Sequence, residues 1–260
     1  MNGVNKTLYI PLYGKAYVSR RGLFIKDEMA EKIWDAEGFS LKGKSKSKWL
    51  AFYMGIRAAV FDEWVLDTLV DCEDTVVIHV GCGLDGRIER VGNKGCLWYD
   101  VDFPEVISER RKYYSEDERY KMIGGDVREP SLLDKIPTRG RAIVLMEGVG
   151  MYLSTTEIKR FFDALSTRFS SVSLLMDCYT CLAARLSERG NPVKDVGVSK
   201  VYGIDDPNEL SSGLRFLCER EMTPRKHTTK LFGLERRIFE GLYAGNFSKK
   251  LYRLYEYEKA

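Results

Sequence analysis

The stretch TVVIHVGCGLDGR, residues 75–87, joins an apolar run to two glycines and an aspartate. The apolar run is typical of a buried strand. Gly81 and Gly83 lack a Cβ, so the backbone can turn sharply after this strand and a ligand can lie against its N–H groups. A pair of glycines also occurs in tight turns that bind nothing, so this stretch alone leaves both interpretations open.

Short strand-like runs recur along the rest of the chain. Strands are predicted at residues 75–81, 96–102, 120–126, 141–148, 171–177, 214–223 and 251–259, and helices at 104–115 and 155–169. Alternating strands and helices predict right-handed βαβ units, hence an α/β fold with a mostly parallel sheet. The last run alternates Leu and Tyr with charged residues, as a strand near a sheet edge does.

The first 70 residues have a helical pattern instead. In residues 25–39 apolar side chains recur at four-residue steps, and residues 49–70 carry a second apolar stripe. Between them, SLKGKSKSK at 40–48 is polar and basic, which predicts a mobile loop. We expect one domain over 1–260, with residues 1–70 as a helical cap and 75–260 as the core.

Composition narrows the class of protein. The 41 basic and 38 acidic residues give a net charge of +3, which argues against a dedicated nucleic-acid binder. No apolar stretch approaches the roughly 18–20 residues of a membrane span, and the N-terminus lacks a secretory apolar segment. Six scattered cysteines in such a chain are expected to be reduced thiols, which predicts a cytoplasmic protein. The oligomeric state is open.

Two acids end the second predicted strand. Asp100 and Asp102 lie 19 and 21 residues after Gly81, and an acid about 20 residues beyond such a loop holds the ribose hydroxyls of a bound nucleotide. Asp102 is closer to the strand tip and is the favoured candidate. The alternative is that one or both acids cap the following helix, which begins near Pro104.

The loop also indicates which nucleotide. GCGLDGR lacks the third glycine of the dinucleotide fingerprint, and Asp85 would repel a diphosphate. Both features argue against NAD. They favour a cofactor with an adenosine and no phosphates, such as S-adenosylmethionine.

These motifs together carry a family resemblance. GCGLDGR, WYDVDFPEVISERR, GGDVRE, MEGVGMYLSTTEI and the N-terminal IPLYGKAYVSR resemble the leucine carboxyl methyltransferase family over about residues 7–170. That family includes protein C-terminal carboxyl methyltransferases and polyketide-type O-methyltransferases. The resemblance implies a Rossmann-like class I methyltransferase sheet, mostly parallel with an antiparallel last strand. One departure is Gly86, where Thr is usual.

The resemblance also implies a set of site residues. Lys15 and Arg57 would bind the carboxylate of the cofactor's methionine moiety, for which Arg offers a bidentate fork. Glu147 would meet its amino group. The other cofactor contacts are Gly81, Gly83 and Asp102, with Asp126 and Val127 beside the adenine, and Tyr152 would face the acceptor.

Each of these residues has a plainer alternative. Lys15 could be a surface lysine, and Arg57 a cation on a helix face. Asp126 could be a helix N-cap, because Glu129 follows three residues later. Tyr152 could be a packing aromatic.

The two histidines and the pair Cys178 and Cys181 give weaker indications of function. His79 lies inside a strand and is expected to be a buried histidine with its hydrogen bonds satisfied, whereas His227 is expected to be exposed, with an open role. Cys178 and Cys181 form a C-x-x-C without a second pair or a histidine cluster, so no metal or redox site is predicted.

The sequence thus predicts an S-adenosylmethionine-dependent O-methyltransferase. The acceptor would be a carboxylate or an acidic hydroxyl of a small molecule or a protein C-terminus, with its pocket shaped by residues 178–213. A carboxylate needs no general base, and no convincing base or other catalytic residue is visible. The alternatives are a non-catalytic S-adenosylmethionine-binding protein and, less favoured, an NAD-dependent dehydrogenase.

Overall fold

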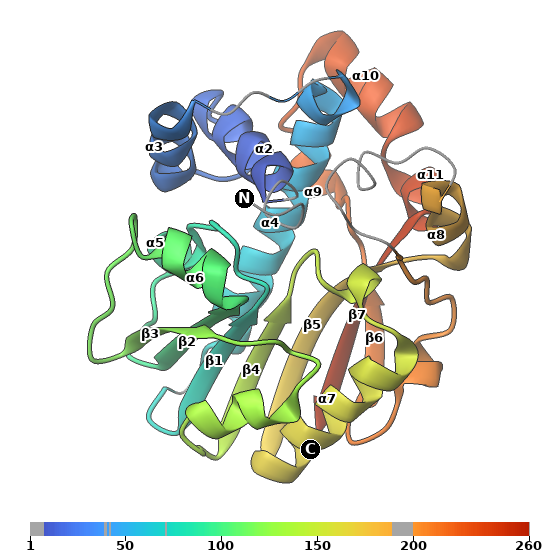
Figure 1. Cartoon of the computed structure of the whole chain (residues 1–260). Coiled ribbons are helices and arrows are strands. Elements are labelled where there is room, and N and C mark those ends of the chain that lie inside the picture. The colour runs from blue at the N-terminus through green and yellow to red at the C-terminus, as the bar shows by residue number, and fades with distance from the viewer. Residues whose placement is uncertain (1–7, 39–40, 42, 71, 189–199, 260) are drawn as a thin grey trace.

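A central seven-stranded sheet organises the computed structural model, which describes residues 8–38, 41, 43–70, 72–188 and 200–259 (Figure 1). The strands lie in the order β3-β2-β1-β4-β5-β7-β6. Their bounds are β1 Thr75–Val80, β2 Leu97–Asp102, β3 Tyr120–Gly124, β4 Arg141–Met146, β5 Ser171–Tyr179, β6 Arg215–Arg220 and β7 Tyr252–Lys259. All seven predicted strands are present.

The sheet is parallel from β3 to β5 and antiparallel at its other end. Every residue of β1 is buried, as expected of an apolar strand covered on both faces. β7 lies antiparallel between β5 and β6, so it is next to the edge strand. The predicted α/β sheet, mostly parallel with an antiparallel end, is therefore confirmed.

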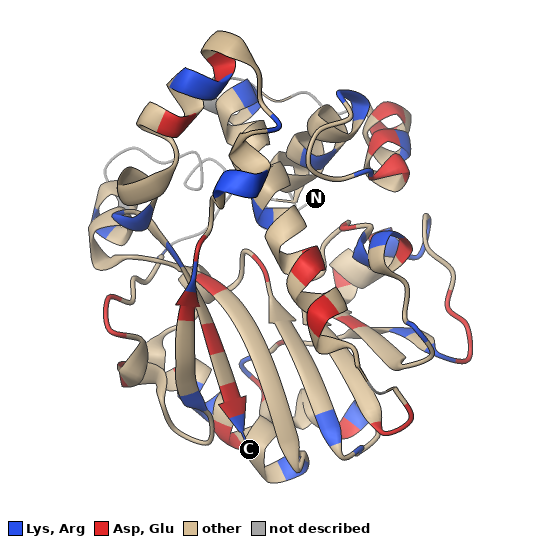
Figure 2. Cartoon of the chain, turned by 180° about the vertical axis from the view of Figure 1, so that it is seen from behind, with Lys and Arg blue, Asp and Glu red and all other residues tan. Residues whose placement is uncertain are grey.

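Helices cover both faces of the sheet and its carboxyl end. The α-helices are α2 Tyr9–Arg20, α3 Glu28–Glu37, α4 Lys48–Thr68, α5 Arg87–Val91, α6 Pro104–Arg110, α7 Thr155–Arg168, α8 Cys181–Glu188, α9 Arg225–Thr228, α10 Gly233–Leu242 and α11 Gly245–Lys249, and the 3₁₀ helices are η1 Gly43–Lys46, η2 Pro130–Lys135, η3 Gly150–Tyr152 and η5 Pro207–Leu210. Figure 1 shows α2, α3, α8 and α10 beyond the carboxyl ends of the parallel strands. Separate apolar clusters fill the two sides, one with α2 and α4 and one with α7. In Figure 2 the long central strands are largely free of charged residues, whereas β6 and β7 at the antiparallel end carry several.

The segment between β6 and β7 is helical, which the sequence pattern did not predict. Its helices α10 and α11 pack on the start of α4, where the rings of Trp49 and Tyr243 stack with centroids 5.7 Å apart, whereas α9 contacts α4 farther along. His227, at the end of α9, is only 2% exposed and faces Glu63. The expectation that His227 is exposed is therefore wrong, because the flanking polar sequence does not reveal that α4 covers it.

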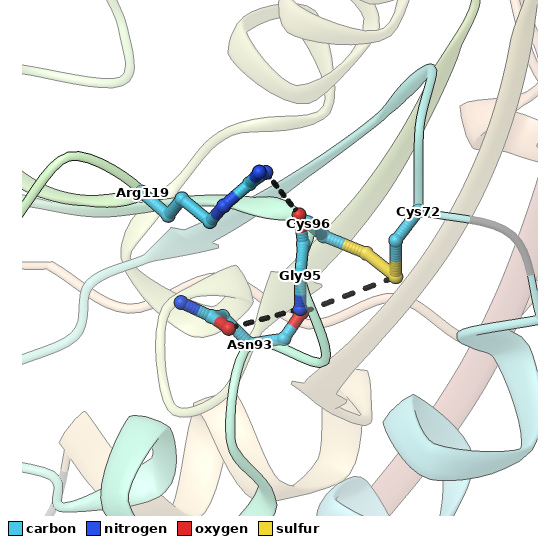
Figure 3. Close-up of a disulfide and its surroundings, with 5 residues drawn as sticks. All are labelled: Cys72, Asn93, Gly95, Cys96 and Arg119. Atoms are coloured by element: carbon cyan, nitrogen blue, oxygen red, sulfur yellow. Dashed lines mark hydrogen bonds between the residues drawn. A yellow bond between two sulfur atoms is a disulfide. The ribbon is translucent and has the colours of Figure 1, made fainter.

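The cysteines also differ from expectation. Cys72 and Cys96 form a disulfide just before β1 and β2, beside Asn93, Gly95 and Arg119 (Figure 3). Parallel pairing places the two strand starts side by side, although 24 residues separate them in sequence. The prediction of six reduced thiols is therefore wrong. The other cysteines, Cys82, Cys178, Cys181 and Cys218, are free.

Two further expectations from the sequence concern the loop at residues 40–48 and membrane-spanning helices. The predicted loop at 40–48 falls partly outside the described residues, and its described part includes η1 and Ser47, which caps α4. Within the described chain, we find no helix with the length and apolar character needed to cross a bilayer.

Candidate functional site

A cavity of about 350 Å³ lies at the carboxyl ends of β1 and β4. Helices α2 and α4 cover it, and the turns after the two strands form its floor. This first cavity brings together six of the predicted site residues, namely Lys15, Arg57, Gly81, Gly83, Glu147 and Tyr152.

The turn after β1 needs its glycines. Gly81 and Gly83 have φ values of +66° and +52°, a region that side chains with a Cβ rarely adopt. A Cβ on Gly81 would lie 2.2 Å from Val149 Cγ2, and one on Gly83 would lie 3.0 Å from Leu8 Cδ2. The turn at residues 81–85 therefore forms part of the cavity wall, with its backbone close to the space inside.

The two acids of β2 have different surroundings. Asp100 is fully buried and accepts hydrogen bonds from Trp98 Nε1 at 2.9 Å and Tyr120 OH at 2.6 Å, and it pairs with Arg110. Burial alone would raise its pKa, but Arg110, His79 and Tyr120 together outweigh burial and lower the pKa to about 2. Asp100 is therefore held by protein groups.

Asp102, at the strand tip, accepts hydrogen bonds from Gly83 N at 2.8 Å and Phe103 N at 2.7 Å. Burial raises its pKa to about 6, and these two N–H groups only partly offset the rise. Helix α6 has no side-chain cap, so neither acid caps it. Asp102 is outside the lining of the first cavity, so its assignment to the ribose stays a prediction.

Lys15 and Arg57 are both buried in the first cavity. Lys15 Nζ lies 2.7 Å from Asp85 and 3.6 Å from Glu147. Arg57 Nε lies 3.1 Å from Glu147 and its Nη1 lies 3.0 Å from Asp177. Burial would raise the pKa of Glu147, but the cations outweigh it and lower the pKa to about 2. Lys15 is therefore no surface lysine, and Arg57 no solvent-facing cation.

Further charged side chains, which were not predicted from the sequence, are connected to Lys15, Arg57 and Glu147. Arg87 and Arg90 lie in α5, just after the glycine turn, and their side chains are buried. Both of them pair with Asp62 and Asp85. We use the term ion cluster for the connected set of four cations and five carboxylates: Lys15, Arg57, Arg87, Arg90, Asp27, Asp62, Asp85, Glu147 and Asp177. The five acids exceed the four cations by one charge.

Gly86 has a structural reason for its departure from the family pattern. A Cβ there would lie 2.7 Å from Asp27 Oδ1. Asp27 caps α3 through Ala30 N and also pairs with Arg90. The missing side chain thus leaves room for a carboxylate from the cap to reach the ion cluster.

The remaining predicted residues lie at the margins. Asp126 and Val127 follow β3 and are outside the lining of the first cavity; Asp126 accepts a hydrogen bond from Arg128 N at 2.9 Å rather than capping a helix. His79 is buried, with Nδ1 3.1 Å from Asp100, so the prediction that it is a buried histidine with its hydrogen bonds satisfied is confirmed. Among the described residues, no group of three or more potential ligands could hold a metal ion.

A second polar pair was missed because its members are 75 residues apart. Tyr252 OH, from β7, donates to Asp177 Oδ2 at 3.0 Å and accepts from Arg57 Nη1 at 2.9 Å. Asp177, in β5, also accepts from Gly148 N at 2.6 Å. Burial raises the pKa of Asp177 to about 6, although Arg57 opposes the rise. The sequence offered only an acid near a strand end as a signal.

Comparison with known proteins identifies the family. A family model described as leucine carboxyl methyltransferase matches residues 11–166, more than half of the chain. The chain belongs to the leucine carboxyl methyltransferase family. The predicted resemblance is therefore confirmed.

Named relatives agree with this assignment. The tetracenomycin polyketide synthesis O-methyltransferase TcmP of Streptomyces glaucescens is 28% identical over 225 residues, covering 83% of this chain and 82% of the relative. The S-adenosyl-L-methionine-dependent methyltransferase dpfgK of Gibberella zeae is 25% identical over 251 residues, covering 85% and 82%. This chain is an S-adenosylmethionine-dependent methyltransferase, so the dehydrogenase alternative is excluded.

Solved structures support the fold alone. Magnesium protoporphyrin IX methyltransferase from Synechocystis PCC 6803 with bound S-adenosylmethionine has a TM-score of 0.51 at 12% identity, covering 88% of this chain and 90% of that one. The class I methyltransferase fold predicted from sequence is confirmed. The first cavity fits the family's cofactor, because buried cations can meet its carboxylate and an excess of acid can balance its ammonium and sulfonium charges.

Proposed function

We propose that this methyltransferase transfers the methyl group to an oxygen, either a carboxylate or an acidic hydroxyl, of a small molecule or a peptide C-terminus. The main support for this proposal is the lining of the first cavity, which contains Lys15, Arg57 and Glu147 together with the glycine turn and Tyr152. The name of TcmP, an O-methyltransferase of polyketide synthesis, supports oxygen as the acceptor atom.

The proposed roles follow from charge. Lys15 and Arg57 bind the cofactor carboxylate, and Glu147 accepts hydrogen bonds from its ammonium group. Gly81 and Gly83 give backbone access, and Asp102 binds the ribose. Asp126 and Val127 contact the adenine at the end of β3, and Tyr152 contacts the acceptor. These roles stand as proposals.

Bound S-adenosylmethionine supplies a methyl group that is already activated by the positive charge on sulfur. The protein orients acceptor and methyl carbon in line, an effect that can contribute on the order of 7–11 kcal/mol. A buried site also excludes water, which strengthens the interactions that hold both reactants.

A screen with methyl-labelled S-adenosylmethionine tests the proposal. Phenols, aromatic acids and peptides with free C-termini are incubated with the protein, and the products are identified by mass spectrometry. Methyl esters or methyl ethers are expected. Methylation only at nitrogen, sulfur or carbon would contradict oxygen transfer, and cofactor binding without turnover would favour a non-catalytic binding protein. A cytoplasmic location also remains a proposal, one that the free-thiol argument no longer supports.

A further inference from the structure

A second cavity of about 640 Å³ adjoins the first. The two share four lining residues, namely Leu50, Met54, Tyr179 and Tyr252. Helix α4, helix α8 and the segment between α10 and β7 form the remainder of the wall. The two cavities therefore meet at these four side chains, and two of the four are tyrosines.

The second cavity differs from the first in charge. Among the residues that the structure describes, its lining contains aromatic, aliphatic and serine side chains and no Lys, Arg, Asp or Glu. Tyr53, Tyr243 and Phe247 are among the lining residues, and Tyr53 OH is hydrogen-bonded to Ser248 Oγ at 2.9 Å. Such a lining suits the uncharged, flat body of an aromatic molecule, since a buried charge without a partner is costly.

Charge balance in the first cavity points the same way. The ion cluster carries one more negative than positive charge when all its acids are ionised. S-adenosylmethionine has an ammonium, a sulfonium and a carboxylate, and hence one net positive charge. Cluster and cofactor together are neutral, so they leave no excess positive charge to bind an anionic acceptor.

We propose that the acceptor is an uncharged aromatic hydroxyl compound that lies in the second cavity, and that Tyr252 and Asp177 receive its proton. This inference rests on the proposed function. Tyr252 lines both cavities, and its hydroxyl already donates to Asp177 Oδ2 at 3.0 Å, so it can relay a proton from the junction to a buried carboxylate.

The step balances. The acceptor O–H bond breaks and its proton goes to Tyr252 oxygen, while the proton of Tyr252 goes to Asp177. The oxygen's electron pair forms the bond to the methyl carbon, and the methyl–sulfur bond breaks with its electron pair remaining on sulfur. The negative charge of Asp177 and the positive charge on sulfur are thus lost together.

Other groups surround the relay, and the pH dependence of the reaction reflects them. The charged and titratable neighbours of Asp177 and Tyr252 are Arg57 and Tyr53 from α4, Glu147 after β4, Tyr152 in η3, Cys178 and Tyr179 in β5. Glu147 raises the pKa of Asp177 and Arg57 lowers it, while burial gives the largest effect and brings it to about 6. Asp177 is therefore ionised at neutral pH and able to accept a proton.

The first test compares 2-naphthol with 2-naphthoate, two probes of similar shape that differ in charge. Binding is measured by fluorescence to protein saturated with sinefungin, a non-transferring analogue of the cofactor. We expect 2-naphthol to bind at least tenfold more tightly, and Ala183→Phe, on the second cavity wall, to weaken that binding at least tenfold without changing sinefungin affinity. Equal or tighter binding of naphthoate, or no binding of either probe, would overturn the acceptor class.

The second test measures methyl transfer to 2-naphthol against pH. Tyr252→Phe and Asp177→Asn are expected to lower kcat by about 10²–10⁴-fold at pH 7, with the acid limb near pH 6 lost in Asp177→Asn. The control is Tyr257→Phe, on the opposite face of β7, whose hydroxyl bonds to Pro207 O at 2.9 Å. It should change kcat less than twofold.

The outcomes distinguish failure of the proton relay, of the acceptor class and of the proposed function. A merely structural role for Tyr252 and Asp177 would lower thermal stability or cofactor affinity and leave the pH profile unchanged, which would overturn the relay, as would the absence of a naphthyl methyl ether with wild-type protein. Failure to bind sinefungin would instead contradict the proposed function. Binding sinefungin with a preference for naphthoate would contradict only this inference.

Discussion

The two cavities are adjacent but differ in the charge of the residues that line them. The first is surrounded by buried charges, and each described charge in it has a partner from another element. The second has an uncharged, aromatic lining among the described residues. The charged cavity is therefore formed by the parallel sheet with the α2–α4 pair, and the uncharged cavity by the first half of α4 together with β5 and the segments that follow it.

Among the changes that test this difference between the two cavities, we expect the substitution of Arg57 to have the largest effect. Arg57→Ala removes the cation that faces both Glu147 and Asp177. Glu147 keeps Lys15 and Arg87, but Asp177 loses the one cation that pairs with it among the described residues, and breaking such a buried pair costs about 3–5 kcal/mol. Cofactor affinity should fall at least about 100-fold, measured by calorimetry. The control is Arg236→Ala, which removes a partly exposed pair with Glu240 on α10. An unchanged affinity in Arg57→Ala would reject its proposed role.

The disulfide provides a change remote from both cavities. Cys72 and Cys96 lie at the amino ends of β1 and β2 and close a 24-residue separation, for which chain-entropy arguments give about 3 kcal/mol of stability. Cys72→Ser combined with Cys96→Ser should lower the free energy of unfolding by about that amount and leave cofactor affinity unchanged. Denaturant unfolding checks this, with Cys218→Ser as control. Equal stability of the double variant and wild type would contradict a structural role.

A substitution in the glycine turn tests the contribution of the backbone to cofactor binding, separately from that of the charged side chains. Gly83→Val adds a side chain where φ is +52° and where the chain faces the first cavity, so cofactor affinity should fall about 30-fold, or about 2 kcal/mol. Gly38→Val is the matched control, because Gly38 has φ +60° and an added Cβ would meet nothing within 4 Å. Both variants carry backbone strain, but only the first should lose affinity. An equal loss in both would remove the turn from the site.

The pH dependence of stability should show the smallest effect. Asp102 and Asp177 have folded-state pKa values raised to about 6, above those of the unfolded chain. The folded state therefore binds protons that the unfolded state does not, and each of the two groups should raise stability by about 1 kcal/mol as pH falls from 7.5 to 5. Below pH 4, protonation of Glu147 and Asp100, with pKa values of about 2, reverses the trend.

Asp177→Asn sharpens this prediction. The substitution leaves four cations and four carboxylates in the ion cluster, so it should raise the melting temperature at pH 7.5 and reduce the gain between pH 7.5 and 5. Thermal unfolding by circular dichroism gives the measurement. A gain as large as that of wild type would show that Asp177 does not titrate in this range.

Much of the cofactor side could be predicted from local sequence. An apolar strand followed by Gly81 and Gly83 must turn sharply whatever surrounds it, and an acid at the tip of the next strand lies beside that turn by parallel pairing. These relations hold within short stretches of chain. The predicted Lys15, Arg57, Glu147 and Tyr152 came from the resemblance, and the structure places all four in the first cavity.

The acceptor side could not be predicted in this way. Tyr252 and Asp177 meet because β7 pairs antiparallel with β5, and nothing in either local pattern specifies that partner. The helices between β6 and β7 bring His227 and Tyr243 to α4, contacts between segments more than 150 residues apart.

The sequence by itself determined the class of fold, the place of the glycine turn and the acid favoured for the ribose, because periodicity and turn chemistry act over a few residues. Only the tertiary structure decided which charges share the ion cluster, which cysteines are joined and what lines the second cavity. Those features depend on distances between remote segments, and side chains that are far apart in sequence acquire partners only when the strands have paired.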